Sequence, residues 1–262
     1  MTIFANPTSI ACNMSEFYKP NRIRNLYDPA STEPFKLSRS KIELYTKCPK
    51  CFYLDRRLGV GQIPPFPFAL NSAVDTLLKK EFDIHRAKGT PHPLMKAYGL
   101  EMVPFQHEKM DEWRENFKGV QYHHKPTNFI MTGAVDDLWV DKNGEIVVVD
   151  YKATSKPAKV TLDAEWQMGY KRQMEMYQWL LRQTGFKVSN TGYFVYCNGK
   201  TDRKAFDAKI DFDIDILPYT GDSAWVEKSL FDIKECLDGE IPNASQNCDH
   251  CAYWNSRKAF EK

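Results

Sequence analysis

The sequence contains neither a long apolar run nor a strong excess of one charge. No stretch is long enough to form a signal peptide or a transmembrane helix, and the first residues, Met-Thr-Ile-Phe-Ala-Asn-Pro, carry no basic charge. The 36 Lys and Arg residues against 34 Asp and Glu residues give a net charge of +2. Any surface for nucleic acid must therefore come from local clusters. We expect a cytoplasmic protein without membrane contact.

Internal repeats, low-complexity segments and a Walker A loop are also absent, so a solenoid and a built-in helicase motor are excluded. A chain of 262 residues with 42% hydrophobic content can bury one substantial core. Residues 1–36 contain Pro, Asn and Ser with little periodicity, which predicts an extended N-terminal arm. We expect residues 37–262 to form one domain.

Hydrophobic periodicity predicts an α/β domain. The segment 89–127 is less regular. A capping box at Ser40-Lys-Ile-Glu43 predicts the start of a short helix that Pro49 should end. The expected strands are 128–141, 145–153, 191–197 and 205–213, and the expected helices are 42–47, 68–88, 163–182 and 222–238.

The segment Lys142-Asn143-Gly144 between the first two strands is a strong hairpin signal. With a three-residue loop that ends in a left-handed Gly144, Asp136 lies directly opposite Asp150. Lys152 then points to the same side, because strand side chains alternate with period two. A two-residue loop would place the two aspartates on opposite faces unless a bulge restored the register.

Two carboxylates held side by side repel each other, so such a pair usually has a compensating cation or shares a proton. Oxygen ligands select Mg²⁺ or Mn²⁺, and Mg²⁺ keeps several waters that can attack a phosphodiester. Lys152 could position that water or neutralise charge that builds on the phosphate. Alternatively, these charges are solvated residues of an ordinary surface hairpin.

Apolar residues at spacings of three and four predict an amphipathic helix over 163–182. Gln173 lies one turn before Tyr177, so both project from one face. Tyr177 is equally suited to a plain core position. A buried Gln173 amide needs hydrogen-bond partners, which the strand that carries Asp150 would provide.

Four of the seven cysteines form two CxxC pairs, Cys48 with Cys51 and Cys248 with Cys251, near the two ends of the domain. Four thiolates brought together by the fold suit either tetrahedral zinc or an iron–sulfur cluster. Such a site would join segments 37–58 and 240–262. We expect no disulfides in a reducing compartment.

The order of these motifs resembles the PD-(D/E)XK nuclease superfamily, in particular its RecB-like branch, which includes CRISPR-associated exonucleases. That branch has a GxxD strand, a D/E-x-K strand with a central aromatic residue, and a helix with QxxxY. The resemblance implies a restriction-endonuclease-like core, a central mixed sheet with flanking helices. It implies metal ligation by Asp136, Asp150 and the backbone carbonyl of Tyr151, catalysis by Lys152, and organisation of the site by Gln173 and Tyr177.

Two positions depart from the RecB-like pattern. The branch often has a metal-binding histidine in a Gly-xxx-His helix, where this chain has Asp75, and aspartate is a better ligand for a hard cation. Glu81 on the same expected helix is the alternative acid. Related enzymes hold a 4Fe–4S cluster with one cysteine before the core and three after it, whereas this chain has two and two. The resemblance implies the cluster, and zinc is the alternative.

We therefore expect a metal-dependent DNA nuclease, most simply an exonuclease on single-stranded DNA or DNA ends. Repair, recombination, phage replication and CRISPR-type processes are all compatible with it. Alternatives are an inactive nucleic-acid-binding module of the same fold and a metal–sulfur redox or scaffold protein. The expected DNA-binding residues near the site are Lys156, Lys171 and Arg172.

Overall fold

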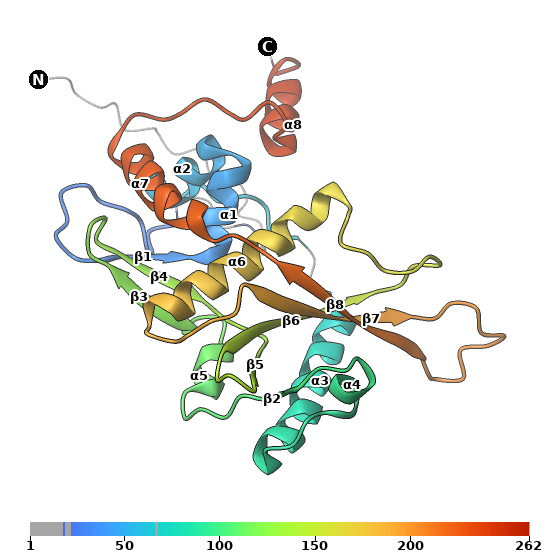
Figure 1. Ribbon diagram of the computed structural model, residues 1–262. Coiled ribbons are helices and arrows are strands. Elements are labelled where there is room, and N and C mark those ends of the chain that lie inside the picture. Colours follow the sequence, from blue (N-terminus) through green and yellow to red (C-terminus); the bar gives the residue numbers. More distant parts are fainter. Residues whose placement is uncertain (1–17, 19–21, 66–67, 262) are drawn as a thin grey trace, which may run out of the picture.

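Two sheets organise the chain in this computed structural model, which describes residues 18, 22–65 and 68–261 (Figure 1). The smaller sheet has the order β1-β4-β3 and the larger has the mixed order β2-β5-β6-β7-β8. The strands are β1 (Phe35–Ser38), β2 (Met102–Pro104), β3 (Val120–His124), β4 (Phe129–Gly133), β5 (Asp137–Asp141), β6 (Ile146–Thr154), β7 (Thr191–Gly199) and β8 (Phe212–Thr220). The helices are α1 (Arg39–Lys47), α2 (Pro49–Arg57), α3 (Ala69–Lys88), α4 (Pro93–Ala97), α5 (Met110–Arg114), α6 (Met168–Gln183), α7 (Ala224–Asp238) and α8 (Asp249–Lys258), with a 3₁₀ turn η1 (Glu165–Gln167) before α6.

Helices cover both faces of the larger sheet. In Figure 1, α3 and α4 lie on one side, and α6 lies on the other with α1, α2 and α7. Side chains of β6 alternate between these layers: Val147 and Val149 pack in the cluster with Phe82 of α3, and Val148 packs in the cluster with Met174 of α6. The expected α/β fold with a central mixed sheet and flanking helices is confirmed.

The β5–β6 hairpin has the expected register. Gly144 adopts a left-handed φ of 76°, and the backbone N–H of Asp141 donates to the carbonyl of Glu145 (3.1 Å). The pairing Asp137↔Val149 is one step from the Asp136↔Asp150 opposition that the three-residue loop predicts. The turn residues therefore set the relative positions of the two acids.

The expected continuous strand 128–141 is wrong, because the chain leaves one sheet and enters the other between Gly133 and Asp137. Gly133 permits this crossing under α6: a Cβ atom at this position would lie 2.7 Å from Cε1 of Tyr177. Only glycine allows the backbone to approach the aromatic ring so closely. Asp136 consequently sits in the short connection just before β5.

The start of α1 also differs from the expectation. The helix begins at Arg39 with Ser38 as N-cap and without a side-chain cap, so the capping box at Ser40 is wrong. Lys47 ends the helix ahead of Pro49, as expected, but Pro49 then becomes the first residue of α2, a position where its missing N–H costs nothing. Two short helices therefore flank Cys48.

The expected strand 205–213 is wrong as well. β8 begins at Phe212 and pairs with β7 from Gly199↔Phe212 to Thr191↔Thr220. Asp207 and Ala208 have positive φ angles of 45° and 56°, which breaks any strand before Lys209. Figure 1 shows the resulting hairpin extending beyond the helical layers.

Part of the segment expected to be an extended arm packs on the domain. Tyr27 and Phe35 are buried, and β1 runs parallel to β4 from Phe35 onward. Residues 1–17 and 19–21 lie outside the described residues. Within the described residues, every helix is too short or too polar to cross a membrane.

Candidate active site and cysteine cluster

Asp150 is fully buried on β6, on the side that faces α6. Asp136 lies opposite it, 23% exposed, and its Oδ2 accepts a hydrogen bond from the backbone N–H of Tyr151 (2.9 Å). Burial raises the pKa of Asp150 to about 7, with Lys152 acting against the rise and Asp136 adding to it. The negative charge of Asp136 therefore makes ionisation of Asp150 less favourable, as is typical of two carboxylates at a cation site.

Lys152 forms an ion pair with Oδ2 of Asp150. Burial acts to lower the pKa of Lys152, but the charges of Asp150 and Asp136 outweigh it and raise the pKa, so the ammonium stays charged. Among the described residues, Lys152 is the partner of Asp150 Oδ2. A metal ion at this oxygen would therefore share it with the ammonium or displace the ammonium.

Gln173 links helix α6 to the acid pair. Its Nε2 donates to Asp150 Oδ1 (2.8 Å) and to the hydroxyl of Tyr177 (3.1 Å). The amide is half-buried, and its expected hydrogen-bond partner on the strand that carries Asp150 is present. Tyr177 is buried and lies against Gly133, so its ring serves the core while its hydroxyl contacts Gln173.

Asp75 lies on α3 at the edge of the same site. Lys79 Nζ is 2.8 Å from Asp75 Oδ2 and 3.6 Å from Asp136 Oδ1, so it lies between the two acids. Burial raises the pKa of Asp75, and Asp136 adds to the rise. Asp75 also lines a pocket of about 90 Å³ together with Lys152 and Tyr151. Glu81, the alternative acid, accepts instead from His92 (2.8 Å).

Asp137, adjacent to Asp136 in the sequence, belongs to a separate ionic network. It is fully buried and forms ion pairs with Arg86 and Arg114, and it accepts a hydrogen bond from the Tyr151 hydroxyl (2.6 Å). Its charge is already compensated. Of the two adjacent aspartates, only Asp136 is available to a cation.

The donor set fits a hard divalent cation. The carboxylates of Asp136 and Asp150 face each other where the chain enters β5 beside the central strand β6, and lysines balance their charge. The carboxylates converge less tightly than the thiols described below. Among the described residues, one group of potential metal ligands has donor atoms that all lie within 4.8 Å of one another. That group is the four cysteines Cys48, Cys51, Cys248 and Cys251.

Two basic residues near the site were missed by the sequence reasoning. Lys79 gives no signal in the sequence beyond its place one turn after Asp75. Arg39 begins α1, is half-buried, and forms no ion pair among the described residues. The Arg39 guanidinium acts to lower the pKa of Asp150, with a smaller effect than those of burial, Lys152 and Asp136.

The three basic residues expected to bind DNA differ in their surroundings. Lys156 Nζ lies 5.0 Å from the centroid of the Trp166 ring, and Lys171 Nζ lies 5.6 Å from that of Tyr219. Arg172 forms two hydrogen bonds with the Glu43 carboxylate, at 2.8 and 2.7 Å. The guanidinium of Arg172 is therefore occupied by a structural ion pair that joins α6 to α1.

The four CxxC cysteines meet in one cluster, as expected. The Sγ atom of Cys51 is 3.6 Å from those of Cys248 and Cys251, and Cys48 Sγ is 3.9 Å from Cys251 Sγ. A single ion with tetrahedral thiolate bonds of about 2.3 Å requires sulfur separations of about 3.8 Å. Three of the six sulfur separations are close to this value, and all six lie within 4.8 Å, so the four thiols could hold a metal ion.

Each CxxC pair opens a helix. Cys48 is the N-cap of α2 and Cys248 is the N-cap of α8. Burial acts to raise the pKa of the Cys48 thiol, but backbone hydrogen bonds involving Cys51 and Ser245 help lower it to about 7. Helix N-termini favour thiolate, the form that binds metal.

A mixed sheet with an acid pair and a lysine at its central strand β6, and a glutamine on the helix that packs there, is the arrangement of a nuclease-like protein. A family model described as "PD-(D/E)XK nuclease superfamily" matches residues 69–256, and the chain belongs to this superfamily. A solved structure described as "Crystal structure of SSO0001" has a TM-score of 0.40 and 13% identity, with 86% of each chain covered. No curated protein matches the chain.

Proposed function

We propose that this protein is a metal-dependent nuclease that hydrolyses DNA phosphodiester bonds, acting as an exonuclease on single strands or DNA ends. The observation that carries the proposal is the opposition of Asp136 and Asp150 across the β5–β6 hairpin, with Lys152 on the same face as Asp150. Membership of the nuclease superfamily supports it. A RecB-like place within the superfamily is part of the proposal.

The proposed metal ligands are Asp136, Asp150, the Tyr151 carbonyl and Asp75. A bound Mg²⁺ or Mn²⁺ would supply Lewis acidity and a bound water of lowered pKa. The hard oxygen donors of Asp136 and Asp150, held on facing strand positions, support this choice of ion. Lys79, now between Asp75 and Asp136, would withdraw from the acids or share their charge.

Lys152 is the proposed catalytic residue. Its raised pKa keeps the ammonium protonated, so it is suited to neutralising charge that develops on the phosphate and to orienting the attacking water. Gln173 positions the Asp150 carboxylate by its 2.8 Å hydrogen bond, and Tyr177 positions Gln173 in turn. Because Arg172 pairs with Glu43, Lys156 and Lys171 are the better candidates for contacts with DNA.

For the cysteine cluster we propose one structural zinc ion. Three sulfur separations of 3.6–3.9 Å, with all four Sγ atoms within 4.8 Å of one another, agree with tetrahedral coordination of one ion. A cubane iron–sulfur cluster, which the RecB-like resemblance implies, places a whole inorganic core between its thiolates and needs them farther apart. The ion would join α2 to α8.

The proposed activity is tested by incubating end-labelled single-stranded DNA with the purified protein in Mg²⁺, in Mn²⁺ and in EDTA. We expect cleavage in either metal, none in EDTA, and a loss of at least about 100-fold in Lys152→Ala. Lys142→Ala is the matched control, because Lys142 lies in the turn of the same hairpin and its ammonium pairs with the exposed Glu101.

Cleavage that survives in Lys152→Ala at the wild-type rate would contradict the proposal. Absence of cleavage by the wild-type protein in both metals, with DNA binding retained, would favour the inactive binding module instead. Product lengths from substrates labelled at either end would separate exonuclease from endonuclease action.

A further inference from the structure

A continuous series of ring and cation contacts leads from the candidate active site to the surface. Lys152 Nζ lies 4.5 Å from the centroid of the Tyr170 ring, and Tyr170 packs edge-on against Trp166 at a centroid distance of 5.4 Å. Lys156 Nζ in turn lies 5.0 Å from the Trp166 ring. Trp166 is thus one aromatic ring away from the catalytic lysine.

The Trp166 ring is unusually exposed for an indole next to a buried site. It is 55% exposed, although tryptophan normally buries most of its surface. It belongs to the 3₁₀ turn η1, which is fixed by Gln167: the Gln167 side chain accepts from the backbone N–H of Ala164 (2.9 Å) and donates to the Thr161 carbonyl (2.7 Å). The ring therefore projects from a well-anchored turn.

Lys156 is anchored in a similar way. Its backbone N–H donates to Asn198 Oδ1 (2.8 Å), and Asn198 Nδ2 donates back to its carbonyl (3.0 Å). These bonds fix the end of β6 to β7 and leave the ammonium at the Trp166 ring. A flat exposed ring beside a cation whose backbone is anchored matches the two parts of a nucleotide, a base and a phosphate.

We propose that Trp166 stacks on an unpaired base of the substrate while Lys156 contacts its backbone phosphate, so that the site selects single-stranded over duplex DNA. This inference rests on the proposed function. Bases within a duplex are already stacked on both faces and cannot offer a π-face to Trp166, whereas an unpaired base can. Stacking is tolerant of sequence, because every base has such a face.

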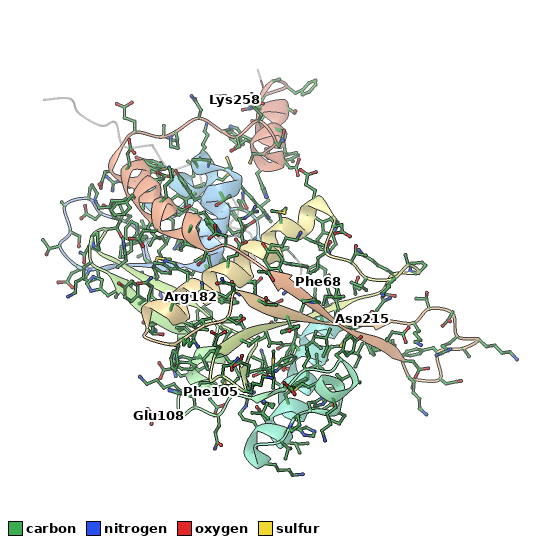
Figure 2. The ribbon with its side chains drawn as sticks, in the orientation of Figure 1. Phe68, Phe105, Glu108, Arg182, Asp215 and Lys258 are labelled. Atoms are coloured by element: carbon green, nitrogen blue, oxygen red, sulfur yellow. The ribbon has the colours of Figure 1, made fainter. Side chains whose placement is uncertain are left out.

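A second exposed aromatic residue flanks the site from the α3 side. Phe68, labelled in Figure 2 just before α3, is 74% exposed. Three residues later, Asn71 donates to the carbonyl of Ala153 near the end of β6 and lines the pocket with Lys152. Exposed rings thus stand just before α3 and just before α6, the two helices that contribute residues to the pocket.

Binding without cleavage tests the inference. A fluorescein-labelled oligothymidylate and a duplex of equal length are titrated with protein in buffer without Mg²⁺ or Mn²⁺, and anisotropy is recorded. We expect Trp166→Ala to weaken single-strand binding about 5- to 100-fold, the range for loss of one stacked base, and to leave duplex binding within about twofold. Trp166→Phe should restore most of the affinity, and Phe117→Ala, at an 89% exposed ring elsewhere, should change nothing.

An unchanged single-strand affinity in Trp166→Ala, or equal losses for both DNA forms, would overturn the inference. A parallel cleavage assay in Mn²⁺ separates it from the proposed function. If the wild-type protein cleaves DNA and Trp166→Ala binds single strands normally, the stacking role fails and the nuclease stands. If nothing is cleaved but Trp166→Ala loses single-strand binding, the nuclease fails and the stacking role stands.

Discussion

Asp136 and Asp137 are adjacent in the chain, yet they accept hydrogen bonds from opposite ends of Tyr151. Asp136 accepts from its backbone N–H at 2.9 Å, and Asp137 accepts from its phenol hydroxyl at 2.6 Å. Asp137 is further balanced by Arg86 and Arg114. The adjacent acids therefore have separate tasks, one in the candidate site and one in the ionic network between α3, α5 and the sheet.

Replacement of each acid by asparagine should separate these tasks. Arg86 and Arg114 share two carboxylates, the partly exposed Asp83 and the buried Asp137. Asp137→Asn removes the buried one, and we expect a loss of up to about 3–5 kcal/mol in the free energy of unfolding. Asp136→Asn removes a charge near Asp150 and should leave the stability almost unchanged while abolishing cleavage. Urea titration of both variants provides the comparison, and equal stability losses would contradict the division.

Tyr151→Phe tests whether this residue acts through its backbone. The substitution removes the hydroxyl that donates to buried Asp137, so we expect a destabilisation of about 1–2 kcal/mol. The backbone carbonyl, the proposed ligand, remains. The rate of DNA cleavage per folded molecule should stay within about twofold of wild type, and a large loss in rate at full folding would assign chemistry to the phenol.

The metal content of the cysteine cluster distinguishes zinc from an iron–sulfur cluster. For protein purified anaerobically, we expect elemental analysis to find about one zinc per chain and no visible absorption from iron–sulfur charge transfer. Cys248→Ser should lose the ion. Four irons per chain in the wild-type protein would contradict the one-ion assignment.

The same ion should attach helix α8 to the rest of the domain. No residue of α8 is buried, so the thiols of Cys248 and Cys251 are its main attachment. Removal of the ion by a chelator should expose Arg257 and Lys258 to trypsin before the rest of the chain is cut. Resistance of this helix in metal-free protein would show that other contacts hold it.

The part of the site fixed by local structure could be predicted from the sequence. The Asn143-Gly144 turn determines the hairpin register, and the register brings Asp136 opposite Asp150. The spacing of Gln173 and Tyr177 likewise predicts one face of a helix. The placement of Asp75 beside Asp136 depends on how α3 packs on the sheet, and the sequence resemblance alone suggested it.

Features set by tertiary packing were not predictable in this way. The chain changes sheets at Gly133 because α6 presses Tyr177 against it, and the apolar pattern of 128–141 contains no sign of that break. The choice between Asp136 and Asp137 depends on Arg86 and Arg114, which come from distant segments. Arg39 was missed because α1 begins earlier than the Ser40 signal indicated.

Binding of Mn²⁺ to the acid pair tests the central claim most directly. Electron paramagnetic resonance reports free Mn²⁺ during titration of the wild-type protein, of Asp136→Asn and Asp150→Asn, and of Asp111→Asn, an exposed acid on α5 that serves as control. Mn²⁺ should bind the wild type and Asp111→Asn and be lost from both site variants, with cleavage lost in parallel. Unchanged binding in both site variants would contradict a cation held between Asp136 and Asp150.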